Sequence, residues 1–157
     1  MTYPSTSLDD RDRQILSELQ TDGRLTNAEL AERVHLSASA CLRRVNILME
    51  SGLVAGTHLV LDQQEAGFEG TAYVSITLDS QDRARLDAFE AKVRHVAQIQ
   101  ECYLLAGQSD YLMRVIFRDM ADLERLHSEV LTRLPGVVRV QSQLTLRTVK
   151  RTTRVPV

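Results

Sequence analysis

The sequence predicts an α+β protein with two parts, a group of three helices followed by a βαββαβ unit. Residues 8–51 space their apolar side chains three and four apart, as helices do, whereas residues 71–79 alternate apolar and polar side chains, as a half-buried strand does. The polar stretch Asp62–Gly67 separates these two patterns. We therefore predict domains at residues 1–61 and 71–157, joined by a linker at residues 62–70.

Size and composition are those of an ordinary globular protein. The 157 residues suffice for two small domains, and 43% are hydrophobic while 25% are charged. No apolar run approaches the ~20 residues that span a bilayer, and the N-terminus has no basic or apolar leader, so we expect a cytoplasmic protein. Cys41 and Cys102 lie among apolar neighbours in different predicted elements, which favours buried thiols over a disulfide. Neither cysteine has a nearby metal-ligand partner, so we expect neither a metal nor a cofactor.

The first predicted helix begins at Leu8 or Asp9. Its first turn is acidic, as the helix dipole favours, and Gly23 is placed to end it. Apolar spacing turns three side chains inward, namely Ile15, Leu16 and Leu19.

The second and third helices are short and meet at a tight corner. Thr26 and Glu29 form a capping box for the second helix, whose buried stripe contains Leu30, Ala31 and Val34. Ser37 is a cap for the third helix, and Gly52 ends it. The buried side of the third helix carries Cys41, Val45 and Leu48, with Leu42 and Met49 flanking them.

The exposed side of the third helix offers small polar groups in its first turn and arginines one turn later. Together with the corner before it, this pattern is typical of a helix-turn-helix, here at residues 27–46. Between Glu32 and Glu50 the only ionised side chains are Arg33, Arg43 and Arg44, so a cationic face interrupts an acidic region. The alternative is a helical hairpin that packs against the rest of the protein and binds nothing.

Net charge is −2, but its distribution is uneven. Residues 1–60 have 6 basic and 8 acidic groups, residues 61–136 have 8 and 13, and residues 137–157 have 5 and none. A monomer with so little positive surface would bind DNA weakly. We therefore expect an oligomer that presents several cationic faces.

After the linker, strand and helix patterns alternate in a fixed order. Residues 82–96 and the segment from Asp119 to Pro135 have helical spacing, and the strands are 71–79, 99–106, 111–117 and 137–149. The order βαββαβ predicts a ferredoxin-like antiparallel sheet with both helices on one face.

The face of this sheet away from the helices is predicted to be partly apolar. Tyr73, Val137 and Val149 lie opposite an aliphatic side that contains Val138, Val140, Leu144 and Leu146. Such a face is expected to pack on a second copy of the chain, the alternative being a polar face in water.

Four segments, in this order and spacing, resemble the Lrp/AsnC (leucine-responsive and asparagine regulator, or feast/famine) family of transcription factors. They are LDDRDRQILSELQTDGRLTNAELAERV, LSASACLRRVNILMESGLV, IQECYLLAGQSDYLMRV and LTRLPGVVRVQS. The resemblance implies an N-terminal winged-type helix-turn-helix, a C-terminal domain for regulation of amino-acid metabolism, and dimers that assemble into octamers of four dimers. This chain departs from the family pattern at His35, where the family usually has glycine, and at Ala38 and Ala40, where proline is common.

On this reading the DNA-binding residues lie around the third helix. We predict that Ser39, Ala40, Arg43 and Arg44 face the major groove and that Arg24, Asn27 and Ser37 lie nearer the phosphates, with Ala38 between them. Arginine can pair bidentately with guanine, which contributes about 1–3 kcal/mol of discrimination. Arg44 is equally suited to holding a phosphate.

The resemblance also implies an effector site for an amino acid between dimers. It assigns this site to the turn Gly107, Gln108, Ser109, Asp110 and Tyr111, and to the apolar residues Leu104, Met120 and Leu144. Backbone N–H groups of the turn would hold a carboxylate and Asp110 the ammonium group. The alternative for Asp110 is a turn residue bonded to its own backbone.

The predicted function is a sequence-specific DNA-binding regulator of amino-acid metabolism or transport genes, and not an enzyme. Two alternative functions are compatible with this sequence. One is a haem-biosynthesis decarboxylase of similar architecture, in which His95 or His127 would act on a porphyrin. The other is a nonspecific architectural protein that wraps DNA. The basic segment Arg147–Arg154 either contacts bent DNA or is a solvated tail.

Overall fold

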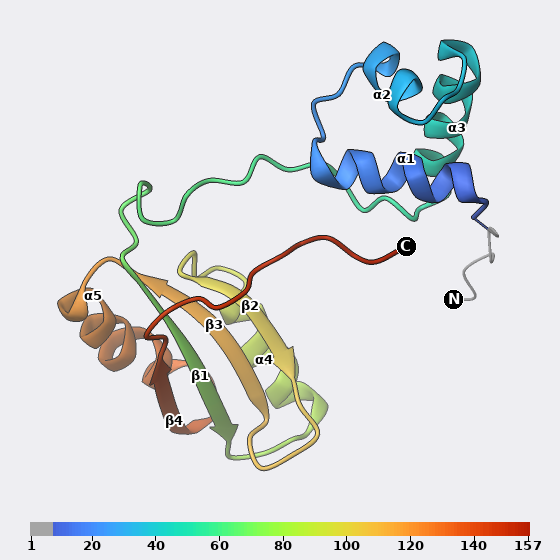
Figure 1. The fold of residues 1–157 in the computed structure, drawn as a ribbon. Helices are drawn as coiled ribbons and strands as arrows, with labels where there is room; N and C mark the ends of the chain where they lie inside the picture. Colours follow the sequence, from blue (N-terminus) through green and yellow to red (C-terminus); the bar gives the residue numbers. More distant parts are fainter. Residues whose placement is uncertain (1–7) are drawn as a thin grey trace. The chain divides into compact units, whose positions relative to one another are not determined.

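The computed structural model describes residues 8–157 and divides them into two compact units (Figure 1). One unit ends at Leu59 and also includes Lys150–Val157, and the other spans Val60–Val149. The last eight residues therefore group with the helical unit, whereas the sequence assigned them to the second domain. Among the described residues, no helix has both the length and the apolar character needed to cross a membrane.

Three helices form the first unit, and a side chain caps the start of each. They are α1 (Asp10–Thr21), α2 (Asn27–Arg33) and α3 (Ala38–Glu50). The predicted capping box of Thr26 and Glu29 and the cap by Ser37 are confirmed. Asp9 and Asp12 form a second capping box at α1, because each side chain accepts the other's backbone N–H.

The buried side chains of this unit are those that helical spacing predicted. They are Ile15, Leu16, Leu30, Ala31, Val34, Cys41 and Leu48. Leu19 and Val45, which were predicted with them, are only half-buried. Two short stretches after α3, residues 53–54 and 58–61, have the apolar composition of extended segments, but they belong to no helix or strand. Cys41 and Cys102 are both free thiols; Cys41 is buried, as expected, whereas Cys102 is half-buried.

The corner between α2 and α3 depends on a left-handed residue. His35 has φ 53°, and the next residue, Leu36, donates its N–H to Ala31 O at 2.9 Å. A left-handed residue followed by this bond ends a helix and turns the chain sharply. Histidine therefore keeps the corner that glycine forms more easily.

The second unit has the predicted βαββαβ order. Its strands are β1 (Gly70–Leu78), β2 (Ile99–Leu104), β3 (Tyr111–Phe117) and β4 (Val137–Leu144). Helix α4 (Arg83–Val93) follows β1, and α5 (Met120–Arg125) follows β3 and continues as a π turn, Leu126–Val130, and a 3₁₀ turn, Leu131–Arg133. The sheet order is β2-β3-β1-β4 with all neighbours antiparallel, and both helices cover one face (Figure 1).

The core of this unit lies between the sheet and its two helices. Alternate residues of β1 and β3 point into it, and the helices add Phe89, Leu123 and Leu126. The ring centroids of Phe89 and Tyr111 lie 4.5 Å apart. This aromatic pair packs α4 against β3.

The last strand differs from its prediction in length. It ends at Leu144 rather than Val149, because Leu144 pairs with Ala72 near the start of β1 and few residues of β1 remain beyond that pair. Leu146 and Val149 are outside the sheet and exposed.

The prediction of which face of the sheet Val137 and Val138 occupy is also wrong. A register shift between Thr77 and Leu78 lets Val137 pair with Leu78, so Val137 packs on the helix-covered core and not on the open face. The same shift leaves Val138 exposed, although it was predicted to be on the aliphatic side.

Candidate DNA-binding and effector sites

The start of α3 presents small groups on a rigid frame. Ser37, Ala38 and Ser39 are exposed and Ala40 is half-buried. Ser37 Oγ accepts the Ala40 N–H at 3.3 Å and also lies 3.3 Å from Ser39 Oγ. This first turn of α3 is therefore exposed and carries only small side chains, so no bulky group would hinder its approach to a groove.

Asn27 holds the two helices of the motif together. Its Nδ2 donates to Ala38 O at 2.8 Å, while its Oδ1 is buried without a hydrogen-bond partner. The side chain thus ties the start of α2 to the start of α3. This contact makes Asn27 a positioning residue more than a free phosphate donor.

The two adjacent arginines of α3 have different surroundings. Arg43 is exposed and has no ion pair among residues 8–157. Arg44 Nη1 lies 2.7 Å from Asp9 Oδ2 and 2.8 Å from Asp12 Oδ1, and only 26% of its side chain is exposed. Hydrogen bonds to Asp12 and Asp9 raise the pKa of Arg44 above its usual value. Arg44 therefore fastens α3 to the start of α1, and Arg43 is the arginine of the pair that can reach DNA.

Arg24 lies between α1 and α2 with its charge open to solvent. Its side chain is 93% exposed, and its nearest carboxylate, Asp22 Oδ1, is 3.6 Å from Nε. Such an exposed ion pair is weak and exchanges readily for a phosphate.

The C-terminal segment joins this unit through hydrogen bonds between the main chain of Val155 and the side chain of Gln20. The Val155 N–H donates to Gln20 Oε1 at 2.7 Å, and Gln20 Nε2 donates to Val155 O at 3.0 Å. The segment therefore docks along α1, while Lys150, Arg151 and Arg154 are exposed. This arrangement adds cationic groups to the helical unit.

In the second unit, Asp110 is buried, and both of its carboxylate oxygens accept hydrogen bonds. It is 5% exposed, its Oδ2 accepts the Leu78 N–H at 2.7 Å, and its Oδ1 accepts Gln81 Nε2 at 2.6 Å. Both oxygens thus form hydrogen bonds within the protomer, and these bonds hold the turn at residues 107–110 against the end of β1. The structure favours a structural role for Asp110, while Gly107 and Gln108 beside it are exposed.

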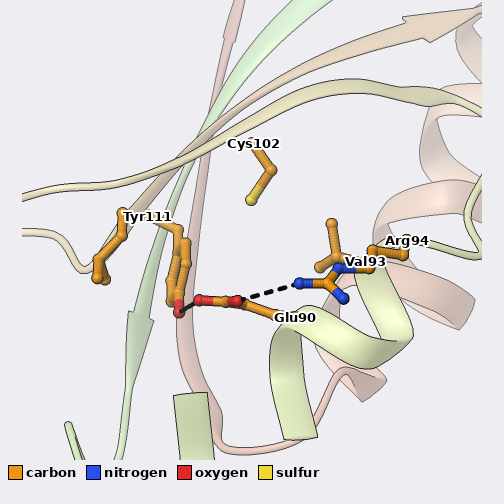
Figure 2. Close-up of a pocket in the computed structure, with 6 residues that line it drawn as sticks. Glu90, Val93, Arg94, Cys102 and Tyr111 are labelled. Carbon is orange, nitrogen blue, oxygen red and sulfur yellow. Dashed lines mark hydrogen bonds and ion pairs between the residues drawn. The ribbon is translucent and has the colours of Figure 1, made fainter. Parts of the chain in front are cut away.

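Tyr111 and Leu104 line a cavity of about 240 Å³ beside α4 (Figure 2). The Tyr111 hydroxyl donates to Glu90 Oε1 at 2.9 Å, and burial, followed by this bond, raises the pKa of Tyr111. The sequence assigns no role in a site to the α4 residues of this cavity, Glu90, Val93 and Arg94. Their helical spacing was visible, but their approach to β2 depends on the fold.

The remaining effector candidates lie at the other end of the sheet. Leu144 pairs with Ala72, and Met120 starts α5 after β3 has ended opposite Gly70, whereas the Asp110 N–H bonds to Ile76 O. One protomer therefore does not bring Met120 and Leu144 together with the turn at residues 107–110. Both are about half exposed, so they are open to contacts.

Comparison with known proteins identifies both units. The Lrp/AsnC ligand binding domain matches residues 71–155, and a winged helix-turn-helix DNA-binding domain matches residues 8–55. The leucine-responsive regulatory protein of Rhizobium meliloti is 39% identical over 143 residues, which are 91% of this chain and 92% of that protein. The chain belongs to the Lrp/AsnC family of transcriptional regulators. The transcriptional regulator AzlB of Bacillus subtilis is 33% identical over 96% of each chain.

Solved structures agree with this assignment. A transcriptional regulator of Neisseria meningitidis, crystallised as a complex with L-Met, superposes with a TM-score of 0.91 at 35% identity and covers 96% of this chain and 97% of its own. An AsnC family regulator of Agrobacterium tumefaciens gives 0.89 at 31% identity, with 95% and 97% covered. The Escherichia coli AsnC structure, at 20% identity, shows the shared fold alone.

This Lrp/AsnC protein is thus a DNA-binding regulator with a ligand-binding domain and not an enzyme, as predicted. The enzymatic alternative had relied on His95 and His127, which are exposed and half-buried respectively. Across the described part of the chain, no three His, Cys, Asp or Glu side chains group as a metal site would require.

Proposed function

We propose that this Lrp/AsnC regulator controls genes of amino-acid metabolism or transport and that an amino acid adjusts its affinity for DNA. The observation that supports this most is the bound L-Met in the Neisseria meningitidis relative, whose fold matches almost the whole chain. The proposal needs no cofactor or metal, and its site of action is the cytoplasm.

DNA contact is assigned to the exposed part of the predicted set. Arg43 and Ser39 on α3 read bases in the major groove, and Arg24 meets a phosphate. Arg44 and Asn27 hold the helices at the correct angle. This division follows from exposure, because only unpaired groups on the surface can exchange water for DNA without first breaking an internal bond.

The effector site is assigned to the contact between dimers. The turn at residues 107–110 lies at one end of the sheet, and Met120 and Leu144 lie at the other, so only different subunits can combine them. Dimers form through the open face of the sheet, and four dimers form an octamer. A ligand held between dimers then changes the spacing of recognition helices on one DNA molecule, which couples the two binding events reciprocally.

A binding experiment tests this function. An operator is first selected from random-sequence DNA by affinity for the protein, and the dissociation constant is then measured by fluorescence anisotropy with each of the common amino acids. At least one amino acid should change the constant by about 5- to 150-fold. Failure of every amino acid to change it would contradict the effector role.

Footprinting on the same DNA tests specificity. A regulator of defined operators protects phased sites of fixed position. Uniform protection that is independent of sequence would instead support an architectural protein.

A further inference from the structure

The cavity beside α4 contains opposite charges next to an apolar wall. Helix α4 contributes Glu90, Val93 and Arg94, while β2 and β3 contribute Cys102, Leu104 and Tyr111 (Figure 2). At about 240 Å³ it is smaller than the roughly 300–1,000 Å³ of pockets for drug-sized ligands. Its size therefore suits a metabolite with few heavy atoms.

One oxygen of Glu90 accepts a hydrogen bond, and the other makes only a long ion-pair contact. Oε1 accepts the Tyr111 hydroxyl at 2.9 Å, which orients the carboxylate from within the protein. Oε2 lies 3.7 Å from Arg94 Nη2, an ion-pair distance that is too long for a hydrogen bond. Glu90 Oε2 and the Arg94 guanidinium are therefore neighbours of opposite charge that a ligand can bridge.

The rest of the cavity is apolar. Val93 is nearly buried, and Leu104, 58% exposed, leaves an opening to solvent. Burial raises the pKa of the Cys102 thiol to about 11, so near neutral pH the thiol is uncharged and acts as part of the apolar wall. Figure 2 shows the Tyr111 hydroxyl bonded to Glu90 and the Cys102 side chain on a separate strand above this pair.

We propose that this cavity is a binding site for an α-amino acid with an apolar side chain, formed within one protomer. Glu90 Oε2 accepts from the α-ammonium group, Arg94 donates to the α-carboxylate, and the side chain lies against Val93, Cys102 and Leu104. An α-amino acid fits because its ammonium and carboxylate groups are attached to the same carbon, and its side chain leaves that carbon in another direction. This site is separate from the effector site proposed above, which uses the turn at residues 107–110 and a second dimer.

Alkylation of Cys102 reports on occupancy of this cavity. The intact protein is treated with N-ethylmaleimide at about pH 9, where some thiolate is present, and modification of Cys102 is followed by mass spectrometry. L-Leucine and L-methionine are the probes. Cys41 is fully buried in the other unit and serves as a control for unfolding.

The expected result is saturable protection of Cys102 by at least one of the two amino acids. Isopentylamine, which lacks the carboxylate, and 4-methylpentanoate, which lacks the ammonium group, should not protect. Glu90→Gln, which can still accept from Tyr111, and Arg94→Gln should each weaken protection roughly tenfold or more. Arg83→Gln removes a comparable arginine, ion-paired to Asp87 at 3.8 Å on the same helix, and should change nothing.

Two results would overturn the proposal. One is an alkylation rate that neither amino acid alters. The other is protection that persists in Glu90→Gln and Arg94→Gln but is lost in Gln108→Ala, which would place the ligand at the turn. Anisotropy on the same variants separates this site from the proposed function, because a DNA response that survives loss of Cys102 protection depends on the turn alone.

Discussion

At the scale of single residues, exposure and pairing divide roles that the sequence left undivided. Arg43 and Arg44 are adjacent on α3 and therefore point about 100° apart around its axis. One points to solvent, and the other meets two carboxylates at the start of α1. Two adjacent arginines thus differ in role: Arg44 forms a structural ion pair, and Arg43 is the one that we assign to DNA.

Substitution of the two arginines should separate these roles. Arg43→Ala should weaken operator binding roughly tenfold or more, as loss of one good base contact does, and should leave the melting temperature unchanged. Arg44→Ala should lower the melting temperature, because Asp9 and Asp12 lose their partner. Thermal unfolding by circular dichroism and anisotropy with the selected operator provide the measurements. Equal melting temperatures together with equal losses of affinity would refute the division.

Asp110 is a second residue whose role depends on its partners. Because its two oxygens accept from Leu78 and Gln81 in a buried position, Asp110→Asn places an amide N–H₂ opposite a donor. We expect the free energy of unfolding in urea to fall by roughly 1–3 kcal/mol. Gln108→Ala, at an exposed position of the same turn, is the control and should have no effect. An unchanged Asp110→Asn variant would favour a ligand role for the carboxylate.

At the scale of elements, the corner of the helix-turn-helix carries strain. His35 has φ 53°, a left-handed conformation that costs an L-residue about 1–2 kcal/mol. Capping by Ser37 and burial of Val34 outweigh this cost, so the corner forms without glycine. The orientation of α3 therefore depends on a residue with a strained backbone, and removal of that strain should increase the stability of the corner.

Replacement of this histidine should stabilise the protein. His35→Gly removes the strain but increases the entropy of the unfolded chain, so we expect a gain of up to about 1 kcal/mol in urea unfolding. Gly52→Ala is the matched control, because Gly52 has φ +80° and an added Cβ would have nothing within 4 Å. That variant should lose stability through strain alone. A loss in His35→Gly would show that its side chain makes a stabilising contact.

At the scale of the whole molecule, the open face of the sheet bears on assembly. Tyr73 is 43% exposed there, between cross-strand neighbours Arg114 and Gln143. Arg114 Nε lies 2.7 Å from Glu101 Oε1, and Tyr103 donates to the same carboxylate. With Val137 inside the core, this face is more polar than predicted, and its aromatic residues are the main apolar groups left for a second copy.

A charge in this face should disrupt the dimer. Tyr73→Asp should shift the mass measured by light scattering after size exclusion to that of a 17.7 kDa monomer. DNA affinity should fall with it, because paired recognition helices are lost. Leu146→Asp is the control, since Leu146 is 99% exposed and lies outside the sheet. An unchanged mass for Tyr73→Asp would place the dimer contact elsewhere.

Much of the fold was predictable because its signals are local. The capping residues Thr26 and Ser37, the alternation in β1 and the helical spacing of Leu86, Phe89 and Val93 each act within a few residues. The length of β4 and the side taken by Val137 were not predictable. They depend on where β1 begins and on a register shift, which only strand pairing reveals.

Prediction of the candidate sites from the sequence is limited for the same reason. The order of elements and the face of α3 that carries Arg43 were determined by the sequence alone, since periodicity and capping act along the chain. The pairing of Arg44 with Asp9, the burial of Asp110 and the cavity between Glu90 and Cys102 were decided by the tertiary structure. Each joins residues that are distant in sequence or on different elements, and no local pattern encodes a contact that exists only after packing.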